Sequence, residues 1–119
     1  MSERPTIKLR VNHRIPAESI QFILLGMEEE GIPSEVARHD DLNPLDLAHE
    51  ASLESRLGVG IGVSLDWVVI TTDKLPAERP YLVGNLNASP DEDRVAGTNA
   101  ARLVKRVPLQ VAAPVKEKS

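Results

Sequence analysis

The chain of 119 residues contains no cysteine. Disulfide bonds, thiolate nucleophiles and zinc sites built from thiolates are therefore excluded. Aromatic residues make up only 3% of the sequence, so the core must be aliphatic, and a surface that stacks the bases of a single-stranded nucleic acid is not expected. The net charge of −4 provides no basic surface for nucleic acid or anionic lipid.

Long hydrophobic runs are also missing. None approaches the roughly 20 residues that span a bilayer, and the N-terminus lacks the apolar region of a signal peptide. We therefore expect a cytoplasmic protein without membrane contacts. The length suits one domain with a single core. We expect this domain to occupy residues 1–109 and the segment 110–119 to be a flexible C-terminal tail.

Apolar periodicity predicts strands that alternate with helices. The expected strands are 7–11, 34–38, 58–63, 67–72 and 81–86, and the expected helices follow Pro16, cover 43–54 and begin near Thr98 or Asn99. The second of these helices should bury Leu45, Ala48 and Leu53, and residues 87–98 should form a polar loop. The two-residue link at 65–66 makes one strand antiparallel to its predecessor. The fold class is therefore α/β, with a mixed five-stranded sheet and helices on both faces.

Three glycines alternate with β-branched residues at Gly58, Gly60 and Gly62. A strand places all three on one face, where a helix can approach closely. The spacing does not fit a dinucleotide-binding loop, which needs G-x-G-x-x-G at the start of a helix. The glycines therefore indicate tight packing.

No catalytic pattern is present, and the chain is not expected to be an enzyme. The serines lack a nucleophile-elbow context. The histidines are His13, His39 and His49, and with Asp40 and Asp41 some of them could hold a metal ion. Since no two histidines are four residues apart on a helix, surface positions explain them better.

The end of the first helix carries charge of the wrong sign. Gly31 and Pro33 are typical of a helix terminus, yet Glu28, Glu29 and Glu30 fill the last turn. The helix dipole and the unpaired carbonyl groups there favour cations. Either the carboxylates are solvated or a positive group meets them. Consecutive helical residues point about 100° apart, so all three cannot bind one ion, but one could bind a metal held mainly by another chain.

Two segments resemble one particular family. Residues 24–33 (LLGMEEEGIP) and 97–108 (GTNAARLVKRVP) are similar to the small subunit of the diol/glycerol dehydratase reactivating factor. A strand at 59–61 and a loop at 74–76 follow in matching order, and the resemblance covers roughly residues 6–109.

The resemblance implies a three-layer α/β/α sandwich, like that of the dehydratase medium subunit, and a chain without catalysis or cofactor of its own. The implied partners are a large ATPase subunit, which binds ATP or ADP, and an adenosylcobalamin-dependent dehydratase. The implied assembly has two large and two small subunits. An apolar surface left exposed without its partner would support a weak homodimer of the chain alone. Exchange with the dehydratase medium subunit would release damaged cobalamin. Glycerol and propanediol dehydratases both remain candidate clients, with or without a bacterial microcompartment.

The resemblance also implies site residues. Glu29 corresponds to the glutamate that reaches a divalent cation, magnesium or calcium, on the large subunit, and Glu28 and Glu30 would lie at the interface. Asn99, Arg102 and Lys105 match the second motif, where a helix cap and solvated basic residues explain them. The alternative is a structural medium subunit of the dehydratase itself that helps to bind cobalamin. Those subunits generally carry an additional N-terminal region.

Overall fold

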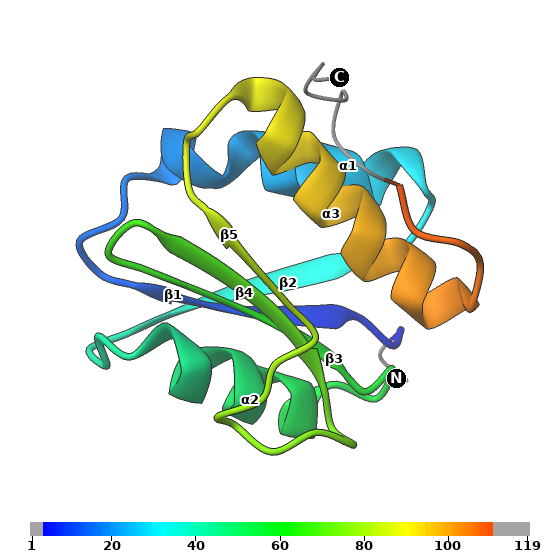
Figure 1. Cartoon of the computed structure of the whole chain (residues 1–119), viewed down its shortest axis with the longest axis horizontal. Helices are drawn as coiled ribbons and strands as arrows, with labels where there is room; N and C mark the ends of the chain where they lie inside the picture. Colours follow the sequence, from blue (N-terminus) through cyan, green and yellow to red (C-terminus); the bar gives the residue numbers. More distant parts are fainter. Residues whose placement is uncertain (1–3, 111–119) are drawn as a thin grey trace, which may run out of the picture.

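A mixed sheet flanked by helices forms the part of the chain that the computed structural model describes, residues 4–110 (Figure 1). The strands are β1 (Ile7–Asn12), β2 (Ser34–His39), β3 (Val59–Ser64), β4 (Trp67–Thr72) and β5 (Leu82–Asn85). The helices are a 3-10 turn (Ala17–Ile20), α1 (Gln21–Glu29), α2 (Pro44–Glu54) and α3 (Pro90–Lys105). The sheet order is β2-β1-β3-β4-β5, and only β4 runs against its neighbours. The predicted fold class is confirmed.

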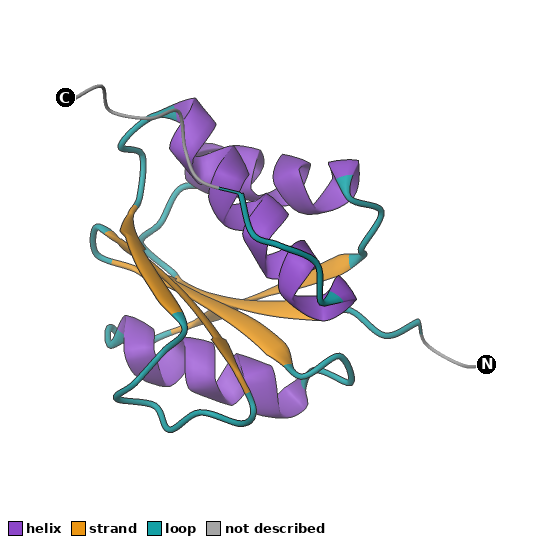
Figure 2. Cartoon of the chain, turned by 45° about the vertical axis from the view of Figure 1, so that its right-hand side comes forward, coloured by secondary structure: helices purple, strands orange, loops and turns teal. Residues whose placement is uncertain are grey.

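The helices form two outer layers. Helices α1 and α3 lie side by side on one face of the sheet, and α2 covers the other face (Figures 1 and 2). This is the expected α/β/α sandwich. No helix within residues 4–110 is long and apolar enough to cross a membrane.

The core is aliphatic, as the scarcity of aromatic residues requires. Its largest part lies between the sheet and the α1–α3 layer. The fully buried side chains there are Ile7, Leu9, Val11, Ile23, Met27, Ile61 and Val63. Burial of such side chains contributes about 1.5–3 kcal/mol each, which makes this layer the main source of stability.

The opposite face of β3 confirms the prediction for two of the three glycines. A Cβ atom on Gly60 would lie 2.2 Å from the Ser52 nitrogen, and one on Gly62 would lie 2.3 Å from the Pro44 oxygen. Helix α2 therefore sits directly on the backbone of β3. Gly58 does not share this role, because it precedes the strand and has a φ of +75°.

The start of α3 corrects the prediction of a loop over residues 87–98. The helix begins at Pro90, and the Ser89 hydroxyl caps it by accepting a hydrogen bond from the Glu92 N–H at 3.0 Å. Thr98 and Asn99 are therefore not caps. Both are buried in the middle of the helix.

A second correction concerns α2. Leu53 is 59% exposed, whereas Leu47 is buried against the sheet together with Ala48. Arg10 of β1 links the sheet to α2 by donating hydrogen bonds to Glu50 at 2.9 Å and to Glu54 at 2.5 Å.

Candidate functional site

The C-terminal end of α1 has the geometry that the sequence predicts. Gly31 has a φ of +78°, and its N–H donates to the Glu28 carbonyl at 3.0 Å. The Ile32 N–H donates to the Met27 carbonyl at 3.2 Å. These two hydrogen bonds form a Schellman motif, which fixes the direction in which the helix ends.

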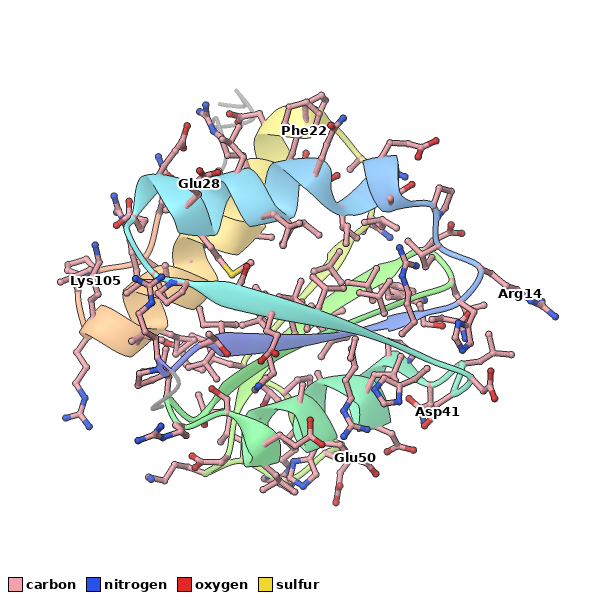
Figure 3. The ribbon with its side chains drawn as sticks, turned by 180° about the vertical axis from the view of Figure 1, so that it is seen from behind. Arg14, Phe22, Glu28, Asp41, Glu50 and Lys105 are labelled. Carbon is pink, nitrogen blue, oxygen red and sulfur yellow. The ribbon has the colours of Figure 1, made fainter. Side chains whose placement is uncertain are left out.

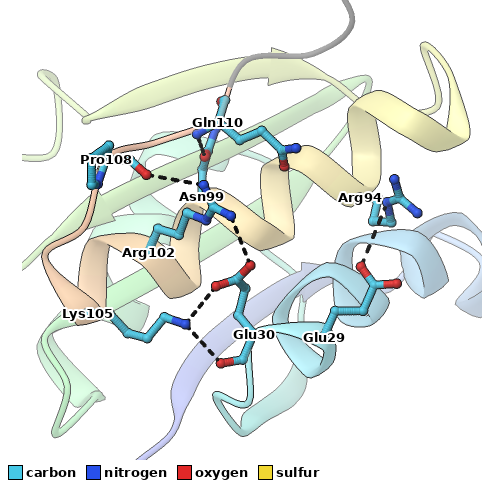
Figure 4. Close-up of polar contacts among 8 residues, drawn as sticks. All are labelled: Glu29, Glu30, Arg94, Asn99, Arg102, Lys105, Pro108 and Gln110. Carbon is cyan, nitrogen blue, oxygen red and sulfur yellow. Dashed lines mark hydrogen bonds and ion pairs between the residues drawn. The ribbon is translucent and has the colours of Figure 1, made fainter.

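The three carboxylates of this helix end have different surroundings (Figure 4). Glu30 forms two ion pairs with α3: its Oε1 accepts from Lys105 Nζ at 2.7 Å, and its Oε2 accepts from Arg102 Nη2 at 3.3 Å. Lys105 also donates to the Glu30 carbonyl oxygen at 3.2 Å. The hydrogen bond from Lys105 lowers the pKa of the Glu30 carboxyl, burial opposes this effect, and Arg102 adds to the lowering.

Lys105 therefore supplies the cation that the end of α1 lacks. Its ammonium group reaches both a terminal carbonyl and a carboxylate, which satisfies the helix dipole from within the chain. The expectation that Arg102 and Lys105 are merely solvated is wrong.

Glu29 and Glu28 remain open to solvent. The Glu29 side chain is 47% exposed, and its nearest cation, Arg94 Nε, lies 3.9 Å away, beyond hydrogen-bond distance. Glu28 is exposed and lies at the edge of a shallow hollow of about 430 Å³ that Arg4, Ile32 and residues near them line. Figure 3 shows Glu28 and Lys105 toward one end of the molecule, with Arg14 and Asp41 at the other.

The close contact between α1 and α3 brings these groups together. A Cβ atom on Gly26 would lie 2.1 Å from the Arg94 oxygen, and one on Gly97 would lie 1.9 Å from the Ile23 oxygen. The two helix backbones are therefore in direct contact. Sequence reasoning assigned neither glycine to this contact, although both lie in the two motifs that carry the family resemblance.

Asn99 binds the backbone that follows α3. Its Nδ2 donates to the Gln110 carbonyl at 2.8 Å, and its Oδ1 accepts from the Gln110 N–H at 2.7 Å. Figure 4 shows this pair beside Arg102, which donates to the Pro108 carbonyl at 3.4 Å. Apart from Gln110, the predicted tail 110–119 lies outside the described residues.

The site contains too few ligands to hold a metal ion alone. Within residues 4–110, no group of three or more His, Asp or Glu residues could bind one. His13 lies 3.2 Å from Asp40, but His39, Asp41 and His49 do not complete a set with them. The described residues therefore do not bring the histidines and these aspartates together as a set of metal ligands. The exposed oxygen atoms of Glu29 are of the type that a hard cation prefers.

The sequence matches the dehydratase medium subunit family over residues 4–110. It is 36% identical over 109 aligned residues to the diol dehydratase-reactivating factor small subunit of Klebsiella michiganensis, and the alignment covers 83% of this chain and 87% of that protein. The propanediol dehydratase-reactivating factor small subunit of Salmonella typhimurium is also 36% identical over 109 residues, with coverages of 83% and 94%.

Two solved structures have the same fold. A chain of a glycerol dehydratase reactivase superposes with a TM-score of 0.86 and 33% identity, covering 91% of this chain and 98% of that one. A chain of a diol dehydratase-reactivating factor complexed with ADP and Mg²⁺ gives a TM-score of 0.86 and 33% identity, with coverages of 92% and 100%.

Proposed function

Because this chain belongs to the dehydratase medium subunit family, among the small subunits of reactivating factors, we propose that it is the non-catalytic small subunit of such a factor. Its client is an adenosylcobalamin-dependent diol or glycerol dehydratase. The observation that carries this proposal is the nearly complete coverage of the two reactivating-factor chains, 98% and 100%, at 33% identity.

The partner is a large subunit with ATPase activity. One of the structural relatives is described as complexed with ADP and Mg²⁺. This chain has no phosphate-binding loop in its sequence, and the described residues hold no cluster of metal ligands. We therefore assign the nucleotide and its magnesium ion to the large subunit, in an assembly of two large and two small subunits. The small subunit then exchanges with the medium subunit of the dehydratase, which opens the enzyme and releases damaged cobalamin.

Glu29 is the residue proposed to act at the subunit interface. Its carboxylate is half exposed and only loosely approached by Arg94, so it is available to complete a divalent-cation site on the large subunit. Glu30 is already paired with Lys105 and Arg102 and fixes the position of the helix end. Glu28 and Glu30 flank the contact.

The second candidate is a structural medium subunit of the dehydratase that helps to bind cobalamin. The observation in its favour is that the matching family carries the medium subunit's name. The coverage of the reactivating-factor chains favours the first candidate.

An affinity pull-down from the native host separates the two functions. The tagged chain is used with and without ATP and magnesium, and the recovered proteins are identified by mass spectrometry. Recovery of a large ATPase subunit, with dehydratase in a nucleotide-dependent manner, supports the reactivating factor. Stable recovery of the large and small dehydratase subunits alone supports the medium subunit and removes the role of Glu29.

A further inference from the structure

An apolar hollow remains on the face of the sheet that α2 covers. Helix α2 packs against β1, β3 and β4, and a hollow of about 270 Å³ lies beside its first turn. The residues that line the hollow are all uncharged and come from the start of α2, the β3–β4 turn, β4 and β5: Asn43, Pro44, Leu45, Leu65, Trp67, Val69 and Val83. Trp67, the only tryptophan of the chain, is 43% exposed, and Val83 is 53% exposed. The described residues therefore leave an apolar surface uncovered here.

Leu65 extends this surface at the tip of the β3–β4 turn. Ser64 pairs with Trp67, so Leu65 and Asp66 form a two-residue turn, in which Leu65 has a φ of +56°. Turns of this kind usually place glycine or asparagine where φ is positive, because a bulky side chain there strains the backbone. Leu65 is 56% exposed, so its burial offsets little of this strain. The fold alone does not explain a leucine at this position, whereas contact of its side chain with another molecule does.

Acidic side chains surround the hollow. The charged residues that adjoin a lining residue in the sequence are Asp46 and Asp66, and both are exposed. A third aspartate, Asp41, accepts a hydrogen bond from the N–H of the lining residue Asn43 at 2.9 Å. The rim formed by Asp41, Asp46 and Asp66 therefore carries negative charge.

Basic groups at the same end of the sheet lie apart from this rim. Arg38 belongs to β2, the edge strand opposite β5, and donates to two backbone carbonyl oxygens. His13 faces Asp40 at 3.2 Å. Arg14 follows β1, which β3 separates from β4, and Figure 3 shows its side chain pointing outward. The rim of the hollow thus remains acidic.

We propose that this hollow is the surface by which the chain binds the client dehydratase, an inference that rests on the function proposed above. The partner surface that fits is an apolar projection flanked by lysine or arginine side chains, which the acidic rim attracts. A second copy of the chain is disfavoured because it would bring two acidic rims together. The proposed contact with the large subunit lies at the end of α1, on the opposite face of the sheet (Figure 1). One chain can therefore be held by the large subunit and recognised by the dehydratase at the same time.

Leu65→Gly tests the proposal without disturbing the fold. Glycine adopts a positive φ freely, so the variant should unfold at the same urea concentration as wild type or at a higher one. Titration calorimetry measures binding to the purified large and small subunits of the dehydratase and, separately, to the purified large ATPase subunit. We expect the dissociation constant for the dehydratase to rise about tenfold, because an apolar contact is lost, and that for the ATPase subunit to stay unchanged. The matched control is Leu53→Ala, which truncates a leucine that is 59% exposed and lies outside the hollow, and it should bind both as wild type does.

The acidic rim has its own test. Asp66→Asn removes one rim charge, so binding to the dehydratase should weaken and should depend less on salt concentration than in wild type. An unchanged salt dependence overturns the assignment of a basic partner surface.

Three results with Leu65→Gly overturn the proposal and leave the proposed function standing. In the first, the variant binds the dehydratase as tightly as wild type. In the second, it loses affinity for the ATPase subunit instead, which assigns the hollow to that partner. In the third, only self-association of the chain, measured by sedimentation, is lost, which assigns the hollow to a second copy. If the wild-type chain does not bind the dehydratase subunits at all, the proposed function itself is contradicted and the proposal falls with it.

Discussion

At the scale of single residues, the three consecutive glutamates at the end of α1 divide into one structural group and two exposed groups. Glu30 is held by Lys105 and Arg102, while the Glu29 carboxylate has no cation within hydrogen-bond distance in the described residues. The sequence shows the conflict between acidic residues and the helix dipole. It does not show that a lysine 75 residues further along the chain resolves it, because that depends on how α1 and α3 pack.

Glu30→Gln should lower the stability of the fold in a pH-dependent manner. The pKa of Glu30 is lowered in the folded state by Lys105, so its contribution is present above its unfolded pKa, about 4.3. The contribution is lost as the pH falls through the lowered folded value. Urea unfolding from pH 7 to pH 3 should show a gap between wild type and variant that closes in acid. Glu28→Gln, at an exposed position, is the control and should show little change.

Asp93→Asn should have the opposite effect at neutral pH. Asp93 is 2% exposed, and burial raises the pKa of its carboxyl. A carboxyl group whose pKa is raised on folding stabilises the fold at pH values below its unfolded pKa. This stabilisation is lost as the pH rises through the pKa of the folded state. Asparagine keeps an oxygen that can accept from the Asn87 N–H, now 3.2 Å from Oδ1. The variant should therefore unfold at a higher urea concentration at pH 7, and the difference should shrink below about pH 4. A variant less stable than wild type at pH 7 contradicts this account.

At the scale of elements, the contact between α1 and α3 determines where the site residues lie. Most of the strands and the first two helices could be predicted from periodicity, because their apolar residues recur at regular spacing. The predicted start of α3 is wrong, although a serine followed by a proline, here Ser89 and Pro90, is typical of the first residues of a helix. After Pro90 the first turn of α3 is polar, and the first buried apolar residue is Val95. The prediction that Leu53 is buried is wrong because the apolar residues of α2 recur at a spacing that is compatible with two faces of the helix. Only the contact with the sheet shows that the buried face is the one that carries Leu47.

Gly97→Ala tests the close approach of these two helices. The added methyl group would lie 1.9 Å from the Ile23 carbonyl oxygen, a backbone atom that moves only if the helices separate. We expect a loss of about 1–3 kcal/mol in the free energy of unfolding, together with weaker pairing of Glu30 with Lys105. Gly84→Ala adds the same group where no atom lies within 4 Å and is the control. Equal unfolding midpoints for the two variants would contradict direct backbone contact.

At the scale of the whole molecule, the strand pattern predicts a mixed sheet with helices on both faces, and two sequence motifs point to the family. The sheet order β2-β1-β3-β4-β5 is known only from the structure. Composition and periodicity do not identify a partner. The two motifs lie on α1 and α3, which places the family's distinguishing residues on one face of the sandwich. That face is the proposed contact with the large subunit.

Glu29→Gln should weaken assembly with the large subunit. The amide keeps the shape of the side chain but loses the charge that a divalent cation prefers. We expect the dissociation constant to rise about tenfold, equivalent to about 1.4 kcal/mol, with the largest effect at low magnesium concentration. Titration calorimetry with the purified large subunit provides the measurement, and Glu28→Gln is the matched control. Unchanged affinity at low magnesium would remove Glu29 from the proposed site.

Recovery of dehydratase activity tests the proposed function most directly. An inactivated adenosylcobalamin-dependent dehydratase is incubated with the large ATPase subunit, ATP, magnesium and fresh cofactor, with or without this chain. The account predicts that activity returns only when the chain and ATP are both present. Full recovery without the chain, or a chain that instead restores activity to a dehydratase lacking its medium subunit, would contradict it.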